Sequence, residues 1–128
     1  MEFPEGLLYT DTHEWVRNEG NQVKVGLTDY AQFQLKDIVY VEFPEIGSEF
    51  KRGESIGGVE SVKTAADLFS PVTGKVTETN GLLKDRPQSI NEDPYGKGWI
   101  LKMELQDQEE LKGLLTSKAY QESLPREE

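Results

Sequence analysis

Short stretches of alternating apolar and polar positions predict a chain built mainly of β-strands. Apolar, β-branched and aromatic runs are separated by glycine, proline and asparagine turns, as is typical of strands. The predicted strands comprise residues 7–9, 13–16, 23–26, 38–41, 56–62, 65–69, 75–79 and 99–105. The last strand alternates most regularly, and its predicted apolar face contains Trp99, Leu101, Met103 and Leu105.

Helical signals are few in the first hundred residues. Thr28 is a suitable N-cap for a short helix over residues 29–34, and Asp29 in its first turn suits the helix dipole. Residues 84–98 contain two proline turns and several asparagine and glycine positions, which predict a long irregular segment.

The spacing of apolar residues changes from that of a strand to that of a helix after residue 106. Asp107 and Glu110 have the spacing of a capping box, and leucines at 111, 114 and 115 predict one stripe of a helix. Ser117 is the predicted cap of a second helix, which Pro125 ends, and we expect residues 126–128 to fray.

The order of these elements predicts the fold class. Many short strands followed by helices indicate a mostly antiparallel β sandwich or barrel with helical attachments. A length of 128 residues suits one domain. We expect a single domain over residues 1–128, with its core at about 20–106 and a C-terminal helical segment at 107–124.

Composition narrows the function classes. A formal net charge of −10 disfavours nucleic acid and anionic membranes as partners. The absence of cysteine excludes disulfides, thiolate zinc sites and cysteine nucleophiles. The acidic, proline-containing start does not fit a signal peptide, and we expect a cytoplasmic protein. No spaced cluster of acidic residues predicts a metal site.

The most informative stretch is Ile56–Phe69, which predicts a β-hairpin with Lys63 at its exposed tip. A lysine at a rigid tip, with no cation close by, is well placed for an enzyme to acylate. The alternative is that Lys63 is simply exposed to solvent in a turn. Judged from the hairpin alone, this is the commoner case. The Gly57–Gly58 pair inside the hairpin lacks the Gly-Lys-Ser/Thr end of a phosphate loop and predicts close backbone packing.

The segment Thr12-His13-Glu14 contains residue types used by hydrolases. Adjacent residues of a strand point to opposite faces, so His13 and Glu14 are not expected to form a catalytic dyad. We interpret His13 as a half-buried strand residue and expect no catalytic residues, because no nucleophile, base and orienting group can be assembled.

Several motifs together resemble the glycine cleavage H-protein family over nearly the whole chain. They are Thr-His-Glu-Trp-Val from residue 12, Asp-Ile-Val-Tyr-Val-Glu-Phe-Pro-Glu-Ile-Gly from 37, Gly-Val-Glu-Ser-Val-Lys from 58, Ser-Pro-Val-Thr-Gly from 70 and Asn-Glu-Asp-Pro-Tyr-Gly-Lys-Gly-Trp from 91. The resemblance implies a lipoyl-domain-like barrel-sandwich hybrid, with antiparallel sheets and short C-terminal helices. It also implies that Lys63 carries lipoate through an amide bond. Val62 and Thr64 flank this lysine, whereas biotinyl domains have methionines there.

The family's work is transport, so the resemblance implies a carrier and not an enzyme. It implies that the lipoylated protein takes an aminomethyl group from the pyridoxal-phosphate glycine decarboxylase (P-protein) to the T-protein, an aminomethyltransferase. Electrons then pass to the L-protein, a dihydrolipoyl dehydrogenase. A lipoylating enzyme is a further implied partner, and we expect a monomer. The alternative is an H-like paralogue that serves lipoate relay or donation rather than glycine breakdown.

Two sets of residues are predicted to support this role. Glu60 and Gly74 are expected to present Lys63, Glu60 through its charge and Gly74 by permitting a turn that shapes the tip. A cationic aminomethyl cargo calls for a carboxylate with a hydrogen-bonding neighbour. Thr12 and Glu14 share a face of the predicted strand and are expected to hold it, with Asp67 as a second candidate acid. The alternative is that Glu14 is a solvated strand acid.

The chain departs from the family at two positions. Lys36 precedes Asp37 where the family usually has glycine, which predicts an altered turn. Thr64 follows the predicted attachment lysine where alanine is common.

Overall fold

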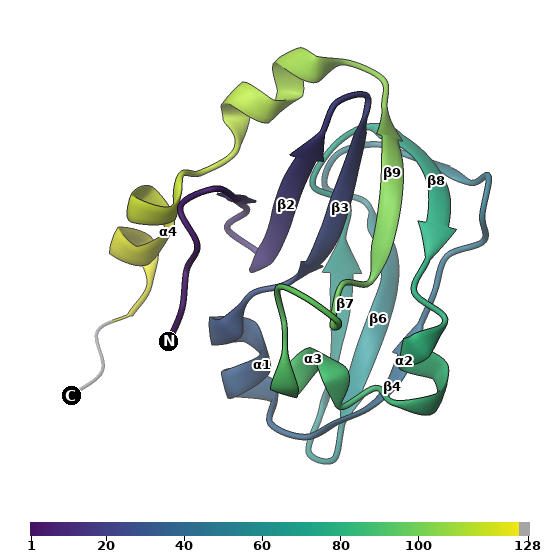
Figure 1. The fold of residues 1–128 in the computed structure, drawn as a ribbon, viewed down its shortest axis with the longest axis vertical. Helices are drawn as coiled ribbons and strands as arrows, with labels where there is room; N and C mark the ends of the chain where they lie inside the picture. Colours follow the sequence, from purple (N-terminus) through teal and green to yellow (C-terminus); the bar gives the residue numbers. More distant parts are fainter. Residues whose placement is uncertain (126–128) are drawn as a thin grey trace.

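The structure is a computed structural model that describes residues 1–125. Two antiparallel sheets form the body of the molecule, with β6 and β7 lying behind β2, β3 and β9 in the view of Figure 1. The strands are β1 (Leu8–Tyr9), β2 (Glu14–Glu19), β3 (Gln22–Leu27), β4 (Ile38–Glu42), β5 (Glu49–Phe50), β6 (Ser55–Ser61), β7 (Ala65–Phe69), β8 (Gly74–Thr79) and β9 (Leu101–Leu105).

The six-stranded sheet has the order β1-β2-β3-β9-β8-β5, and the three-stranded sheet has the order β4-β6-β7. The alternation of side chains explains why the two sheets pack together. Inward residues of the large sheet and of the small sheet form one buried cluster, in which Val25, Met103 and Val76 meet Val59 and Leu68. The mainly β, antiparallel prediction is confirmed.

A second, aromatic cluster lies outside this core. Leu7, Tyr9, Trp15 and Tyr120 are buried together, with Phe3 among the residues packed on them. Tyr120 belongs to helix α4 (Ser117–Ser123). The C-terminal helix is therefore pinned to the N-terminal segment, and the two lie next to each other at the left of Figure 1.

Helix α1 (Asp29–Leu35) begins as predicted, because Thr28 Oγ1 accepts a hydrogen bond from the backbone N–H of Ala31 at 3.1 Å. The helix ends at Lys36, the position where the family usually has glycine. This residue has φ 66° and ψ −148°, a conformation that glycine adopts far more readily than lysine. Lys36 therefore ends the helix in a strained conformation.

The prediction that residues 84–98 are irregular is wrong in part. Two single-turn helices, α2 (Leu82–Asp85) and α3 (Ser89–Glu92), lie in or beside this segment. Each contains a residue buried in the core, Leu83 and Ile90, so tertiary packing sets these turns where local propensity is weak. Strand β5 is not among the predicted strands, because it has only two residues and is defined by its pairing with β8.

Two details of the C-terminal segment differ from the prediction. A 3₁₀-helix, η1 (Gln108–Gly113), replaces the expected α-helix. Asp107 caps it by accepting from the N–H of Glu109 at 2.9 Å, but the capping box is wrong, because the Glu110 carboxylate bonds instead to the backbone N–H of Thr73 at 2.6 Å. The cap of α4 is Thr116 and not Ser117. Helix α4 ends before Pro125, and residues 126–128 lie outside the described part of the chain.

The predicted single face of the last strand is also wrong at one position. Leu101 and Met103 are fully buried in the main core. Trp99 precedes β9 and packs with the aromatic cluster, where the ammonium groups of Lys24 and Lys102 lie 5.2 and 5.8 Å from its ring centroid. Trp99 thus lies on the same side of the sheet as Lys102, whereas the alternation predicts opposite faces for these two residues.

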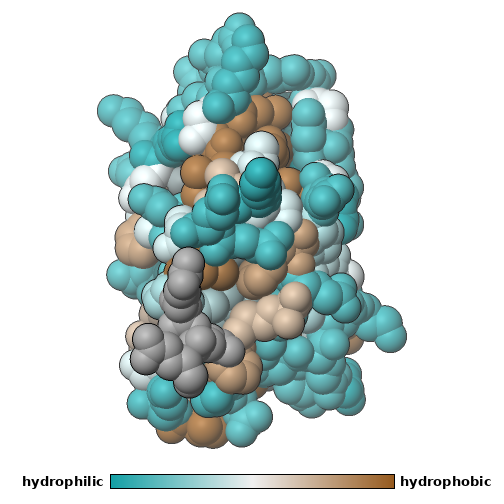
Figure 2. Space-filling view, turned by 90° about the vertical axis from the view of Figure 1, so that its left-hand side faces the viewer, coloured by the Kyte–Doolittle hydropathy of each residue, from teal (hydrophilic) through white to brown (hydrophobic). Residues whose placement is uncertain are grey.

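Among the described residues, no helix is long and apolar enough to cross a membrane. Figure 2 shows a mostly hydrophilic face on the side of the molecule that carries α4, with hydrophobic atoms gathered between hydrophilic edges.

Candidate functional site

The hairpin of β6 and β7 carries the predicted attachment lysine. Gly58 pairs with Asp67, Val59 with Ala66 and Glu60 with Ala65, so that residues 62–64 form the turn. Lys63 is exposed in this turn, which is the lowest point of the molecule in Figure 1. The hairpin prediction is confirmed, with Lys63 at its tip.

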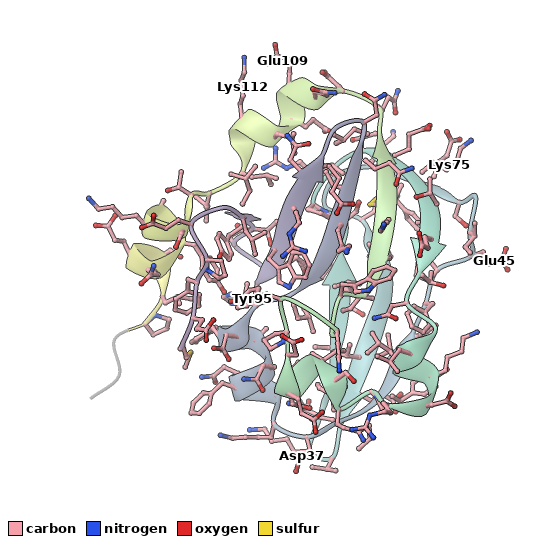
Figure 3. The ribbon with its side chains drawn as sticks, viewed as in Figure 1. Asp37, Glu45, Lys75, Tyr95, Glu109 and Lys112 are labelled. Carbon is pink, nitrogen blue, oxygen red and sulfur yellow. The ribbon has the colours of Figure 1, made fainter. Side chains whose placement is uncertain are left out.

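The Ser61 side chain fixes the shape of the tip. Its hydroxyl donates to the carbonyl of Thr64 at 3.1 Å and accepts from the N–H groups of Lys63 and Thr64 at 3.3 and 3.1 Å. The carbonyl of Asp37 accepts from the N–H of Val62 at 3.0 Å, and Figure 3 shows Asp37 at this end of the molecule. The backbone on both sides of Lys63 is therefore held in place. One local signal could have indicated Ser61, namely a small hydroxyl residue just before a turn.

The environment of the Lys63 ammonium fits an amide-linked group. Within residues 1–125, Lys63 makes no ion pair, and its neighbour Val62 is 68% exposed. Nothing in the described structure competes for the ammonium nitrogen or covers it. Glu60 is also exposed, on β6 just before the turn, and its backbone pairs with Ala65.

The prediction that Gly74 permits a turn beside the tip is wrong. Gly74 is the first residue of β8 and pairs with Phe50 and Leu105, at the end of the molecule opposite to the hairpin tip. Glycine is needed here for a different reason, because a Cβ atom would collide with the backbone carbonyl oxygen of Glu104. Gly74 contributes close packing between β8 and β9 and does not contact Lys63.

Glu14 is fully buried, so the reading of this residue as a solvated strand acid is wrong. Its carboxylate accepts hydrogen bonds from the hydroxyls of Thr10, at 2.6 Å, and of Thr12, and from the N–H of Phe69 at 3.2 Å. Burial raises its pKa from 4.5 to about 7, against the opposing effect of these hydrogen bonds.

Thr12 and Glu14 do come together, but not as strand neighbours. Strand β2 begins at Glu14, and Thr12 lies in the preceding turn. The residue between them, His13, is not a strand residue either. It has φ 75° and lies in the left-handed region, which brings the Thr12 hydroxyl back onto the Glu14 carboxylate.

A groove of about 270 Å³ runs beside the hairpin. Its walls come from the turn before β2, from α1 and from β6 and β7, and its lining includes Thr12, His13, Tyr30, Ala66 and Asp67. Asp67 is exposed and offers a carboxylate at the groove. Glu14 is not part of the lining, but its carboxylate accepts a hydrogen bond from the hydroxyl of Thr12, which is. The sequence predicted Thr12 and Asp67 but gave no reason to expect Tyr30 there.

The groove lies within a short distance of the tip. Ala66 and Asp67 are three and four residues after Lys63 along the same hairpin. At about 3.3 Å per strand residue, this corresponds to roughly 10–13 Å. An arm attached to Lys63 can fold back along β7 to the groove.

Comparisons with known proteins decide which family has this arrangement. The family model for the glycine cleavage H-protein matches residues 7–127. The chain belongs to the glycine cleavage H-protein family. Members of this family are the lipoyl carriers of the glycine cleavage system, and the resemblance noted from the motifs is confirmed.

Individual relatives agree with the family model. The chain is 48% identical to a glycine cleavage system H protein of Anaeromyxobacter sp. strain K, over the full length of both chains. It is 49% identical to one from Listeria monocytogenes serotype 4a, covering 97% of this chain and 99% of the relative. A crystal structure of the Mycobacterium marinum H protein superposes with a TM-score of 0.83 at 37% identity, covering 94% and 99% of the two chains. The lipoyl-domain-like barrel-sandwich fold is thereby confirmed.

Proposed function

We propose that this chain carries lipoate on Lys63 and moves an aminomethyl group from the P-protein to the T-protein, before the L-protein takes the electrons. The observation that carries the proposal is the exposed Lys63 in a turn that Ser61 and Asp37 hold from both sides. A rigid tip with a free ammonium suits recognition by a lipoylating enzyme. When bound, lipoate supplies a dithiol–disulfide pair that exchanges the cargo and electrons.

The chain's own residues provide a resting place for the cargo. The aminomethyl group is cationic, and Asp67, with its carboxylate, and Thr12, with its hydroxyl, line the groove beside the hairpin. A carboxylate with a neighbouring hydroxyl is a strong acceptor for an ammonium. The groove thus holds the cation and limits its contact with water while the protein travels between enzymes.

Glu14 acts on the cargo through its hydrogen bond with Thr12. Its carboxylate fixes the Thr12 hydroxyl and carries negative charge at neutral pH for part of the time, because its pKa is about 7. A cation in the groove favours the charged form of Glu14, so loading of the cargo is coupled to release of a proton. Glu14 acts through Thr12 and does not contact the cargo itself.

Reconstituted glycine breakdown tests the carrier role. Lipoylated wild-type protein, mixed with P-, T- and L-proteins and tetrahydrofolate, is expected to support release of ammonia from glycine. Lys63→Arg is expected to lose this activity, since a guanidinium is a poor acyl acceptor. Lys75→Arg, an exposed lysine on β8 (Figure 3), is the matched control and should keep it. A lipoylated wild-type protein that supports no glycine turnover would favour the lipoate-relay alternative.

Spontaneous loss of ammonia from the loaded protein tests the cargo site. Asp67→Asn is expected to accelerate the loss up to about fivefold, the range of a partly exposed ion pair. Glu45→Gln removes an exposed acid from the turn after β4, outside the groove, and should change nothing. Equal rates for Asp67→Asn and wild type would show that Asp67 does not hold the cargo.

Glu60 is proposed to assist the lipoylating enzyme through its charge. It is exposed on β6 next to the tip, and its substitution by glutamine leaves the backbone pairing with Ala65 intact. Glu60→Gln is expected to slow the initial rate of lipoylation without changing thermal stability. An unchanged rate would remove this role.

A further inference from the structure

Tyr120 links the C-terminal helix to the wall of the cargo groove. It is fully buried in α4, with its ring stacked on Tyr9 at a centroid distance of 4.9 Å. Its hydroxyl lies 2.8 Å from Nδ1 of His13 and 2.8 Å from Oγ1 of Thr28. His13 in turn lines the groove, so a residue 107 positions away in sequence touches the groove wall.

His13 is held in an unfavourable backbone conformation by several contacts. A non-glycine residue with φ 75° costs free energy and persists only where its surroundings fix it. The His13 N–H donates to the carbonyl of Thr10 at 3.2 Å, and its carbonyl accepts from the N–H of Thr28 at 3.1 Å. The ring packs on Tyr30 at 4.9 Å. Conformational strain at a groove wall is typical of functional positions.

The hydrogen bonds give the tyrosine hydroxyl one preferred direction. Thr28 is fully buried, and its Oγ1 already accepts the N–H of Ala31, so its hydroxyl hydrogen points to Tyr120. The oxygen of Tyr120 accepts that hydrogen, and its own hydroxyl donates to His13 Nδ1. The reverse direction would leave the buried Thr28 hydroxyl hydrogen without an acceptor, which is costly.

We propose that Tyr120 is a positioning residue that holds His13 in its uncharged form, with the proton on Nε2, and thereby keeps positive charge out of the cargo groove. This proposal rests on the cargo site proposed above. A protonated His13 in the groove that also contains Asp67 would compete with the cationic cargo for that carboxylate. The C-terminal helix thus contributes to the cargo site without lining it.

The surroundings of His13 shift its pKa in both directions. Burial lowers the pKa of His13, and the neighbouring Asp11 carboxylate opposes that effect. Asp67 shares the groove, and Glu14 follows directly in the chain; both favour a protonated imidazole when charged. Burial raises the pKa of Tyr120 to about 12, so its hydroxyl stays protonated and remains available as a donor.

The single histidine of the chain makes the first test direct. In the lipoylated full-length protein, ¹⁵N and ¹H NMR of the imidazole should show the Nε2–H tautomer at pH 8. Tyr120→Phe removes the donor and should raise the protonation constant of His13 about two- to tenfold, as loss of one hydrogen bond predicts. Tyr9→Phe also removes one buried hydroxyl of the cluster, but that hydroxyl donates to the carbonyl of Pro4. It should leave the His13 titration unchanged.

The second test measures the cargo. Tyr120→Phe should accelerate spontaneous ammonia loss from the loaded protein at pH 6 more than at pH 8, whereas Tyr9→Phe should match wild type at both. An Nδ1–H tautomer in wild type, or an unchanged His13 titration in Tyr120→Phe, would overturn the proposal. So would an altered titration without altered cargo loss, provided that Asp67→Asn does accelerate the loss. If Asp67→Asn has no effect, the cargo site itself fails, and with it the role of Tyr120 there.

Discussion

Replacement of Glu14 by glutamine tests how burial acts on the carboxylate that holds the Thr12 hydroxyl. Glu14 is fully buried, and burial raises its pKa from 4.5 to about 7 although several hydrogen bonds favour the charged form. The unfolded chain has the ordinary value of 4.5. Between pH 4.5 and pH 7, therefore, the folded protein holds a proton that the unfolded chain has released.

The sign and size of the effect follow from this difference. Because the folded state binds more protons in this window, wild-type stability decreases as pH rises from about 4.5 to 7. Each pKa unit corresponds to about 1.4 kcal/mol. The rise in the Glu14 pKa from 4.5 to about 7 therefore lowers the free energy of unfolding by about 3 kcal/mol between pH 4.5 and pH 8. This is a large part of the total stability of a domain, which is about 5–15 kcal/mol. Glutamine cannot ionise, so Glu14→Gln lacks this contribution.

Urea denaturation followed by tryptophan fluorescence provides the assay. At each pH from 4.5 to 8, the unfolding free energy of Glu14→Gln is subtracted from that of wild type. The other acidic residues contribute equally to both proteins, so their effects cancel in this difference. Glutamine has one acceptor oxygen where the carboxylate has two, so it cannot accept from both the threonine hydroxyls and the Phe69 N–H; this lowers the stability of the variant at every pH and does not alter the slope. Glu60→Gln, an exposed acid, is the control and should show no slope. A constant difference, or one that increases with pH in favour of wild type, would refute the dominance of burial over the hydrogen bonds.

Three further substitutions test the local structure by chemical denaturation. Gly74→Val is expected to cost about 3 kcal/mol or more, since its side chain meets the backbone oxygen of Glu104 and has no room to shift; stability equal to wild type would contradict this packing. Lys36→Gly should stabilise the protein by about 1 kcal/mol, because relief of the left-handed strain exceeds loss of the cation–π contact with the ring of the exposed Phe33; a loss of stability would mean that the strain is absent. Ser61→Ala should cost about 1 kcal/mol and speed amide hydrogen exchange at Lys63; unchanged exchange would show that the serine does not hold the tip.

The strands and the hairpin could be predicted because their signals are local. Alternation sets β3 and β8, and the turn residues around Lys63 place the tip within one residue. The N-cap of α1 is equally local, because a threonine hydroxyl reaches the third N–H after it. Such features need no knowledge of distant parts of the chain.

The errors arose where tertiary contacts decide. Glu110 has the correct spacing for a capping box, yet its carboxylate bonds to Thr73, from the loop before β8. Gly74 has the composition of a turn residue but is required by the approach of β9. The groove beside the hairpin shows the same limit, since Tyr120 reaches its lining residue His13 across the fold and no sequence spacing indicates that contact.

The central claim is that Lys63, at the fixed tip of the hairpin, is the residue that carries lipoate. The most direct test is intact-mass and peptide mass spectrometry after incubation with a lipoylating enzyme, comparing wild type, Lys63→Arg and Lys75→Arg. Wild type and Lys75→Arg should each gain the mass of one lipoyl group, located on the peptide that contains Lys63, and Lys63→Arg should gain none. A lipoyl group on any other lysine of Lys63→Arg, or an unmodified wild-type protein, would contradict the account.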